Sequence, residues 1–187
     1  HTPLAGSFNI ATGIVWSGGA GTYDPNNTTT NAVYTPTAAE IAAGSVMLTL
    51  TTTGNGACAA SSDQMTITFG AAPTANAGPD QTICANNASV VLNGAVTIAT
   101  GGIWSGGTGT YNPNNTTLNA VYTPSAAERT AGTVNLTLTS AGNGLCNAVS
   151  DQVTWTITPA PTVNAGPDQS LCSNNPMATL AGSYTVA

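Results

Sequence analysis

Four cysteines are the residues in this sequence with the most evident chemistry, and they form two evenly spaced pairs. Cys58 and Cys84 are 26 positions apart, and so are Cys146 and Cys172. No Cys-x-x-Cys pair is present and the single histidine is His1, which disfavours a tetrahedral zinc site. Regularly spaced cysteine pairs are typical of disulfides in proteins that fold in an oxidising compartment. We therefore treat all four cysteines as disulfide candidates.

The seven acidic residues are the next group that could do chemistry. They never cluster, and no Asp-rich loop of the kind that binds calcium is present. Asp63 with Asp80, or Asp151 with Asp168, could meet at a junction between domains and bind calcium there. The competing role for these four aspartates is the capping of turns, which the sequence favours. No resident metal or cofactor is therefore predicted.

The sequence contains many serines but no internal histidine and no lysine that could serve as a general base. A hydrolase triad needs such a base beside its nucleophile, so we do not expect an enzyme. Aromatic side chains could instead form a shelf on which a sugar stacks, although core packing is the favoured interpretation. These aromatic residues are Trp16, Trp104, Tyr23, Tyr111, Tyr34 and Tyr122.

One stretch shows which elements position these residues. The segment 34–50, YTPTAAEIAAGSVMLTL, returns 88 positions later as 122–138, YTPSAAERTAGTVNLTL. In each copy a hydroxyl residue is followed three positions on by Glu40 or Glu128, which is the form of a capping box. An alternating apolar strand then follows the short helical turn. A strand, a capped turn and a core strand predict a corner between the two sheets of a β-sandwich.

The same offset extends through the whole chain. Residues 4–99 and 92–187 are identical at roughly two positions in three without a gap, which indicates a tandem array. We assign 1–72 to a partial repeat that lacks its first strand, 73–160 to a complete repeat, and 161–187 to the start of a third. The chain is interpreted as part of a longer array.

The complete repeat is expected to be all-β. About seven short strands separated by Gly, Asn and Pro turns fit an immunoglobulin-like sandwich. Asn76–Cys84 is expected to form one edge strand, and 90–98 a second strand whose alternate residues, including Ile98, point inward. Trp104 would be the core anchor on the third strand. In the partial repeat, 4–10 is expected to end a strand, and Trp16 takes the role of Trp104.

Composition excludes several partners. Only 4% of residues are charged, 41% are hydrophobic, and Arg129 is the one basic residue among Lys and Arg. Nucleic acids and anionic membranes are held through Lys and Arg, so neither is an expected partner. No apolar run approaches the length of a membrane span, so no membrane insertion is expected.

The motifs AGPDQ, WSGGTGTY, AVYTPSAAE, AGTVNLTLT and GLCNAVSDQVT together resemble the repeats of giant surface adhesins of gliding Bacteroidetes. Those repeats are related to PKD-like and immunoglobulin-like domains, and the gliding-motility adhesins of flavobacteria are their best-known parents. The resemblance covers essentially the whole chain. It implies a long protein that is exported by the type IX secretion system and carried as a filament on the outer membrane.

This resemblance implies a structural segment of an extracellular adhesin, a rod-like spacer for surface attachment or gliding motility. Its partners would be neighbouring repeats of the same chain, with extracellular polysaccharide or surfaces contacted through other domains. The alternative is a module that binds carbohydrate or calcium in its own loops.

Immunoglobulin-like topology limits the cysteine pairing. Cys84 would follow the first strand at the end where the chain leaves the domain, and Cys146 would lie in the hairpin at the opposite end. A strand of eight residues separates these ends by roughly 27 Å, whereas a disulfide needs Cα atoms within about 7 Å. Cys84 could pair with the hairpin cysteine of the following repeat. Local pairs Cys58–Cys84 and Cys146–Cys172 are the alternative.

Overall fold

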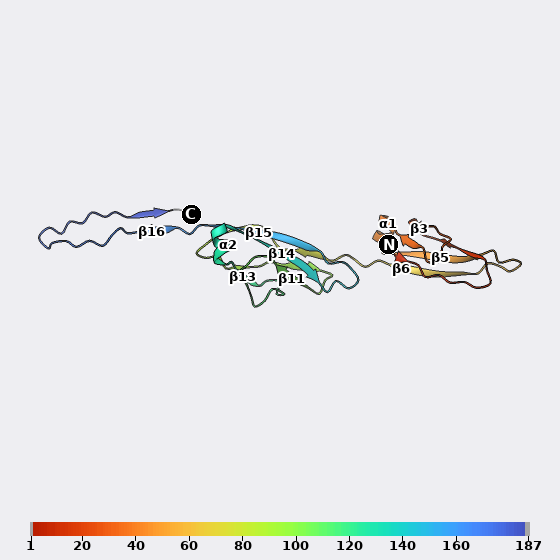
Figure 1. Cartoon of the computed structure of the whole chain (residues 1–187). Coiled ribbons are helices and arrows are strands. Elements are labelled where there is room, and N and C mark those ends of the chain that lie inside the picture. The colour runs from red at the N-terminus through yellow and green to blue at the C-terminus, as the bar shows by residue number, and fades with distance from the viewer. Residues whose placement is uncertain (1, 186–187) are drawn as a thin grey trace. The chain divides into compact units, whose positions relative to one another are not determined.

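The computed structural model describes residues 2–185 of the chain. These divide into two compact units, His1–Ala71 (unit 1) and Ala72–Ala187 (unit 2) (Figure 1). Each unit is described by itself, and unit 2 comes first because it contains every strand of one repeat.

The first sheet of unit 2 has four strands in the order β11-β14-β15-β8. They are β11 (Gly101–Ser105), β14 (Thr133–Ala141), β15 (Ser150–Thr158) and β8 (Gln81–Cys84). The first three are antiparallel, whereas β8 runs parallel to β15 with Cys84 opposite Thr158. A parallel strand at this edge means that the chain reaches the sheet from its other layer rather than through a hairpin.

The opposing layer of unit 2 is made of shorter strands. Its order is β12 (Thr110–Asn112), β13 (Val121–Thr123) and β9 (Val90–Val91). Two more strands, β10 (Ala95–Thr97) and β7 (Thr74–Asn76), pair with each other in antiparallel orientation.

Backbone hydrogen bonds join β9 and β10 into one interrupted strand. Leu92 N–H donates to the carbonyl of Ala120 at 2.8 Å, and Gly94 N–H donates to that of Leu118 at 3.1 Å. The second layer therefore runs from β12 through β13 and the β9–β10 strand to β7. Two facing layers with this order make an immunoglobulin-like β-sandwich, as predicted.

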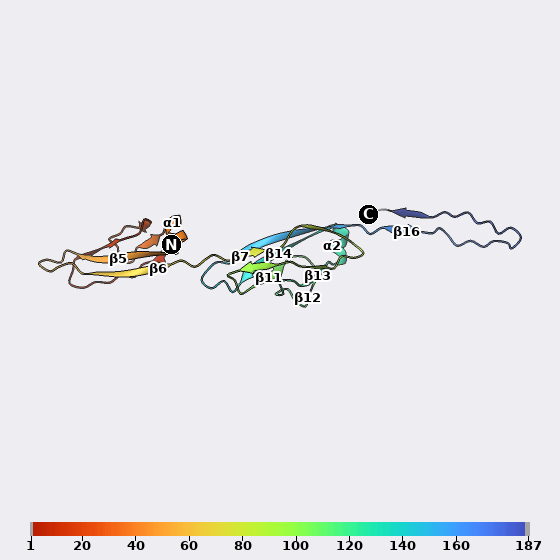
Figure 2. The same cartoon turned by 180° about the vertical axis from the view of Figure 1, so that it is seen from behind.

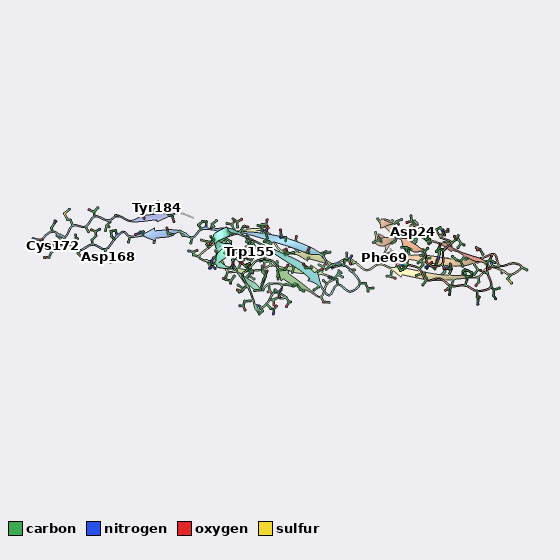
Figure 3. The ribbon with its side chains drawn as sticks, in the orientation of Figure 1. Asp24, Phe69, Trp155, Asp168, Cys172 and Tyr184 are labelled. Atoms are coloured by element: carbon green, nitrogen blue, oxygen red, sulfur yellow. The ribbon has the colours of Figure 1, made fainter. Side chains whose placement is uncertain are left out.

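The core of unit 2 lies between these layers. Alternate residues of β14 and β15 point into it, which is the period expected for strands with one buried face. Trp155 lies inside the sandwich in Figure 3. The buried cluster consists of Ala77, Leu92, Trp104, Ala120, Tyr122, Val134, Leu136, Leu138, Val153, Trp155 and Ile157.

Unit 1 repeats the same plan with fewer strands. One sheet has the order β2-β5-β6 and the other β1-β4-β3. The first contains β2 (Gly13–Ser17), β5 (Ser45–Thr53) and β6 (Ser62–Thr68). The second contains β1 (Thr2–Pro3), β4 (Val33–Thr35) and β3 (Thr22–Asp24). Its smaller buried cluster consists of Leu4, Ile14, Trp16, Tyr34, Val46 and Leu48.

Each unit has one short helix, and within residues 2–185 there are no others. These are α1 (Ala38–Ala43) and α2 (Ala126–Ala131). Seen from behind, α2 lies at one end of the unit 2 sandwich, where the chain passes from β13 to β14 (Figure 2). The predicted corner between two sheets is confirmed. Among the described residues, neither helix has the length and apolar character needed to cross a bilayer.

Three strand predictions were wrong. Asn76–Cys84 is not one strand, because Gly78 with φ 86° and Pro79 separate β7 from β8, which join different sheets. Ile98 does not point inward: it has φ 64° and is 60% exposed, so the inward alternation stops before it. No strand extends over 4–10, because the partner that holds the equivalent β10 in unit 2 has no counterpart among the residues of unit 1.

Two strands remain near the end of the chain. β16 (Thr162–Asn164) and β17 (Ser183–Thr185) pair in antiparallel orientation and form a sheet of their own. Their register matches that of β7 with β10, since Asn164 faces Ser183 as Asn76 faces Ala95. The loop between β16 and β17 carries Cys172 and Asp168 (Figure 3).

Candidate functional site

The most highly connected polar group in unit 1 is the carboxylate of Glu40, at the third position of α1. It accepts hydrogen bonds from the backbone N–H of Thr37 at 2.7 Å and of Ala20 at 2.7 Å, and from the hydroxyl of Tyr34 at 2.8 Å. The Thr37 hydroxyl in turn accepts from Glu40 N–H, which completes the predicted capping box. Gly44 ends the helix in the left-handed conformation with φ 81°, also as predicted.

Unit 2 builds the same group from Glu128. This carboxylate accepts from the N–H of Ser125 at 2.7 Å, the N–H of Thr108 at 2.6 Å and the hydroxyl of Tyr122 at 2.8 Å. Glu128 is only 8% exposed, so its charge is held inside the fold by these donors. We call this group, with its counterpart in unit 1, the Tyr–Glu corner.

A glycine pair closes the corner. The Tyr122 hydroxyl accepts from Gly109 N–H at 2.9 Å while it donates to Glu128. Gly107 has φ 67°, and a Cβ there would lie 2.0 Å from the Tyr122 hydroxyl oxygen, so only glycine fits. The Trp-Ser-Gly-Gly motif is therefore explained by the close approach of backbone to a buried tyrosine.

The hydrogen bonds of the corner control its ionisation. In unit 1, backbone donation from Thr37 and Ala20, which outweighs desolvation, lowers the pKa of Glu40 from 4.5 to about 2. In unit 2, burial opposes ionisation of Glu128, but donation from Thr108, Ser125 and Tyr122 outweighs it, and the pKa is lowered. A carboxylate that stays ionised and fully engaged has a structural role rather than one in proton transfer.

The tyrosines respond in the opposite direction. Burial first, and then the hydrogen bond to Glu128, raise the pKa of Tyr122. Burial and the nearby Glu128 charge raise the pKa of Tyr111 to about 12. Its ring lies 4.8 Å from that of Tyr122, centroid to centroid. Both phenols therefore stay protonated and act as hydrogen-bond donors at any physiological pH.

Trp104 and Trp16 belong to the core. The sequence favoured this core role over a shelf on which a sugar stacks. Trp104 has no exposed surface, and its indole N–H donates to the carbonyl of Leu118 at 3.0 Å. Trp16 is buried at the equivalent place, although its N–H has no hydrogen-bond partner among the described residues. Tyr34 and Tyr122 are also fully buried, so the six aromatics do not form an exposed platform.

Two of the four candidate aspartates hold the first strand segments of unit 2. Asp151 accepts from the N–H of Ala77 at 2.8 Å, and Asp80 accepts from the N–H of Thr154 at 2.8 Å. Asp63 and Asp168, the equivalents of Asp151 and Asp80, are exposed. Within residues 2–185, no group of three or more His, Cys, Asp or Glu residues is placed to hold a metal ion. Calcium binding by these aspartates was the less favoured alternative to turn capping, and it remains untested.

The cysteines take the places that topology indicated. Cys84 ends β8 opposite Thr158, where the chain leaves the sandwich, and its thiol lies 3.9 Å from the carbonyl oxygen of Pro159. Cys146 lies in the loop between β14 and β15, before the register position of Ser150. The length of β15 thus separates the two cysteines. Cys58 and Cys172 are exposed. The pairing of the cysteines remains a prediction.

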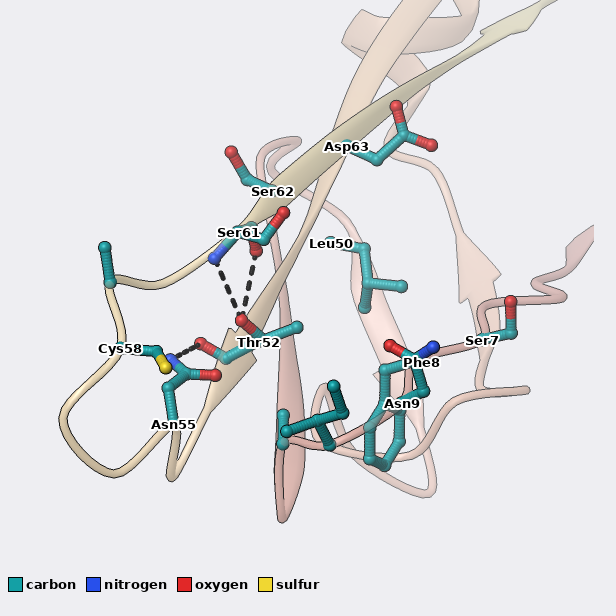
Figure 4. A pocket seen from close by; sticks show the side chains of 13 residues that line it. Ser7, Phe8, Asn9, Leu50, Thr52, Asn55, Cys58, Ser61, Ser62 and Asp63 are labelled. Carbon is teal, nitrogen blue, oxygen red and sulfur yellow. Dashed lines mark hydrogen bonds between the residues drawn. The ribbon is translucent and has the colours of Figure 1, made fainter.

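A hollow in unit 1 was not anticipated. It measures about 350 Å³ and lies beside β5 and the loop before β6 (Figure 4). Figure 4 shows Leu50, Phe8 and Thr52 around the same open space, with Asp63 on the far strand. A smaller hollow of about 270 Å³ adjoins it and reaches Trp16 and Met65. Leu50, which packs against the core of unit 1, lines both hollows, and most of the other residues around the larger one are polar.

Comparison with known proteins finds no related sequence, and it finds solved cadherin structures of low similarity. No protein-family profile and no curated protein sequence matches this chain. Solved structures that resemble it include protocadherin gamma B7 extracellular cadherin domains 1–4, with TM-score 0.37 and 11% identity over 95% of this chain and 48% of that one. Drosophila N-cadherin EC1–3 has TM-score 0.38 and 12% identity, over 86% and 62%. Mouse cadherin-23 EC22–24 has TM-score 0.35 and 10% identity, over 83% and 57%. This chain therefore spans about half the length of such structures, and no function is carried over from them.

Proposed function

We propose that this chain is a structural repeat segment of a long extracellular adhesin or surface filament. In this role it is a rod-like spacer in surface attachment or gliding motility. The sequence motifs shared with the adhesin repeats of gliding Bacteroidetes support this assignment. Export by the type IX system and a place on the outer membrane follow from the same resemblance. Its partners are neighbouring repeats, while polysaccharide or other surfaces are contacted by other domains.

The observation that carries the proposal is that acidic side chains, which could otherwise bind or react with a ligand, make hydrogen bonds that stabilise the fold. The carboxylates of Glu40 and Glu128 close equivalent corners with the same set of donors. Asp80 and Asp151 hold strand segments through backbone N–H groups. A repeat whose polar side chains maintain the sandwich is suited to bearing load and setting distance rather than to binding a ligand.

Small-angle scattering from an array of three copies of 73–160 tests the spacer role. The linkers between repeats are short and contain proline, which restricts their flexibility. We therefore expect an extended particle whose maximum dimension grows by a constant increment per repeat. A compact scattering profile whose dimension grows as the cube root of repeat number would contradict the spacer role.

The same array tests the alternative. A chelator should leave the melting temperature within about 2 °C of the untreated value if calcium has no structural role. A fall in melting temperature that added calcium reverses would favour a calcium-binding module. The fall should then be absent when Asp80 and Asp151, the counterparts of Asp168 and Asp63 in each copy, are changed to Asn. Binding to a glycan array by the folded repeats would favour a carbohydrate-binding module.

A further inference from the structure

The sequence contains six Asn-x-Ser/Thr sequons, which are the acceptor pattern for N-linked glycans. A pattern this short arises often by chance in a chain rich in Asn and Thr, so the sequence alone does not distinguish the six. The structure does, because it shows which side-chain amide nitrogens and hydroxyls the fold already uses. The six asparagines are Asn26, Asn27, Asn87, Asn114, Asn115 and Asn135.

Two of these asparagines hold the loop between two strands against its sheet. The side-chain nitrogen of Asn115 donates to the carbonyl of Trp104 at 2.9 Å, and the backbone carbonyl of Asn115 accepts from the N–H of Trp104 at 2.7 Å. In unit 1, Asn27 makes the same two bonds with Trp16, at 3.0 Å and 2.7 Å. The side-chain nitrogens of Asn27 and Asn115 are therefore committed to the fold.

Asn114, the preceding residue in the loop between β12 and β13, has the opposite arrangement. Its side-chain oxygen accepts from the N–H of Thr116 at 3.0 Å, from the Thr116 hydroxyl at 2.7 Å and from the Thr117 hydroxyl at 3.1 Å. This is an Asx-turn whose hydroxyl donor is the threonine of the sequon. The Asn114 side chain is exposed, and its nitrogen has no hydrogen-bond partner within residues 2–185.

Unit 1 builds the same turn at Asn26. The side-chain oxygen accepts from the N–H of Thr28 at 3.0 Å, from the Thr28 hydroxyl at 2.7 Å and from the Thr29 hydroxyl at 3.1 Å. Asn26 is exposed, and its side-chain nitrogen likewise lacks a partner in the described part of the chain. Asn26 and Asn114 are 88 positions apart, so the turn occurs once in each repeat.

The two remaining sequons are built into the sandwich of unit 2. In the sequon 87–89, the hydroxyl oxygen of Ser89 lies 2.9 Å from that of Thr123, and the central alanine is buried. The sequon 135–137 lies within β14, which pairs with β11 and β15, and its central residue Leu136 is fully buried. Neither sequon can be bound by an enzyme without opening the fold.

We propose that Asn26 and Asn114 are attachment sites for N-linked glycans, one in each repeat. The glycosyl donor is an oligosaccharide carried on a lipid pyrophosphate. The side-chain nitrogen forms a bond to the anomeric carbon of the first sugar, and the bond from that carbon to the pyrophosphate oxygen breaks. The pyrophosphate leaves with the electron pair, and the nitrogen gives up one proton to the transferase.

The hydrogen bonds of the Asx-turn assist this step. When the amide nitrogen gives up its proton, negative charge moves onto the side-chain oxygen. Three donors already point at that oxygen in each repeat, and hydrogen bonds to a charged form favour it. The same bonds leave the nitrogen free on the solvent side of the loop. The turn thus prepares Asn26 and Asn114, whereas the bond to a tryptophan carbonyl withholds Asn27 and Asn115.

Glycans at these positions suit the surface of the chain. Only 4% of its residues are charged, so few charged groups hydrate the surface, and a glycan is bulky and solubilising. Both asparagines lie in exposed loops, where a glycan displaces no core residue. The inference goes beyond the spacer role and does not depend on it, because it stands on the bonds of two loops.

Enzymatic glycosylation of the folded full chain tests the proposal. The chain is made in a bacterial cytoplasm that has no oligosaccharyltransferase, and its folding is checked by circular dichroism. It is then incubated with a lipid-linked oligosaccharide and a single-subunit oligosaccharyltransferase that requires only Asn-x-Ser/Thr. The mass should rise from 18.4 kDa by that of two oligosaccharides.

Peptide mapping locates the two glycans. Release by a glycosidase in heavy-oxygen water converts each modified asparagine to labelled aspartate, and fragmentation separates neighbouring positions. We expect the label at Asn26 and Asn114. Absence of label from either residue, or label at any of the other four asparagines, overturns the proposal. The same mapping of glycopeptides from the protein in its source organism should find both sites occupied, and an unmodified chain there overturns the proposal.

Two neighbouring substitutions give matched controls, with Asn26 as the internal reference. Thr116→Val removes the sequon of Asn114 and keeps that of Asn115, whereas Thr117→Val does the reverse. Modification in unit 2 should be lost in the first variant and retained at Asn114 in the second. Thr116→Ser restores the sequon and should restore modification. Modification of Asn115 in Thr116→Val, or its loss from Asn114 in a folded Thr117→Val chain, overturns the proposal.

Discussion

Replacing Glu128 with alanine should destabilise unit 2 far more than a typical surface substitution. The change removes an acceptor that is 8% exposed and is used by Ser125, Thr108 and Tyr122. It leaves those three donors without the carboxylate, and it also removes the side-chain half of the capping box that begins α2.

The size of the effect follows from these contacts. A hydrogen bond to a charged group contributes about 1.5–3 kcal/mol, and burying an unsatisfied donor costs about 1–3 kcal/mol. Thr108 is exposed, so water can replace its lost acceptor, whereas the hydroxyl of the fully buried Tyr122 cannot be resolvated without a rearrangement. We therefore expect Glu128→Ala to cost about 3–5 kcal/mol, less than the simple sum because the bonds share one acceptor.

Urea unfolding followed by tryptophan fluorescence can measure this in the full chain. Unit 1 contains Trp16, whereas unit 2 contains Trp104 and Trp155. A Trp16→Phe background leaves a signal from unit 2 alone and avoids treating two units as one transition. The midpoint should fall by roughly 1.5–5 M for a loss of about 3–5 kcal/mol and a slope of about 1–2 kcal/mol per M.

Gln152→Ala is the control within unit 2, because Gln152 is an exposed polar residue of β15 and its loss should change stability by less than about 0.5 kcal/mol. A Glu128→Ala loss below about 1 kcal/mol would refute the reasoning, since the corner would then be a consequence of folding rather than a support for it. Tyr122→Phe should show part of the same loss and be less than additive with Glu128→Ala.

Other predictions follow from the same contacts. Because folding lowers the pKa of Glu40 from 4.5 to about 2, its stabilisation of unit 1 is present above pH 4.5 and is lost as pH falls through about 2. Melting curves from pH 7 to pH 2 should therefore be flatter for Glu40→Gln than for the wild type, and identical pH profiles would contradict the assignment. Trp104→Ala should cost about 3–5 kcal/mol by leaving a core cavity, and a loss below about 1 kcal/mol would contradict the core role. Non-reducing peptide mapping of the full chain, whose repeats differ in sequence, should show no Cys84–Cys146 peptide. In an array whose repeats can be told apart by sequence, we expect Cys84 bonded to the hairpin cysteine of the following repeat. Detection of Cys84–Cys146 would contradict both this bond and the strand order.

The parts of the Tyr–Glu corner that depend on residues close together in the sequence could be predicted. A hydroxyl residue three positions before Glu40 or Glu128, with a glycine after the turn, specifies the cap and the helix end. The bond between Glu128 and Tyr122 was missed because it crosses from the preceding strand, where no local rule pairs the two. The repeated distance of six residues from tyrosine to glutamate was a usable signal.

The strand errors have a common cause. Alternating apolar residues predicted a strand through Ile98, but the bond from Ala99 N–H to the Thr97 carbonyl turns the chain there. Gly78 and Pro79 could have marked the break between β7 and β8, because glycine permits φ 86° and proline cannot donate to a sheet. Composition and the alternation of apolar residues indicate that a strand is present. They do not indicate as well where a strand ends or where the chain passes from one sheet to the other.

The hollow beside Leu50 in unit 1 could be seen only in the structure. A first strand missing from unit 1 was expected, but which side chains it would leave uncovered depends on the packing of Leu50 against residues distant in the sequence. The comparison of Leu50 with Leu138 shows this directly, since the same residue in the same strand changes burial with the presence of a covering segment.

Mechanical unfolding of an array of identical copies of 73–160 tests the spacer role most directly. Each repeat should unfold as a separate event, and 88 residues at about 3.6 Å each, less the folded length, should release roughly 280 Å of chain per event. The account predicts a series of equal steps whose number matches the number of repeats in the array. An array that extends smoothly without steps, or in steps of unequal length, would contradict a load-bearing repeat.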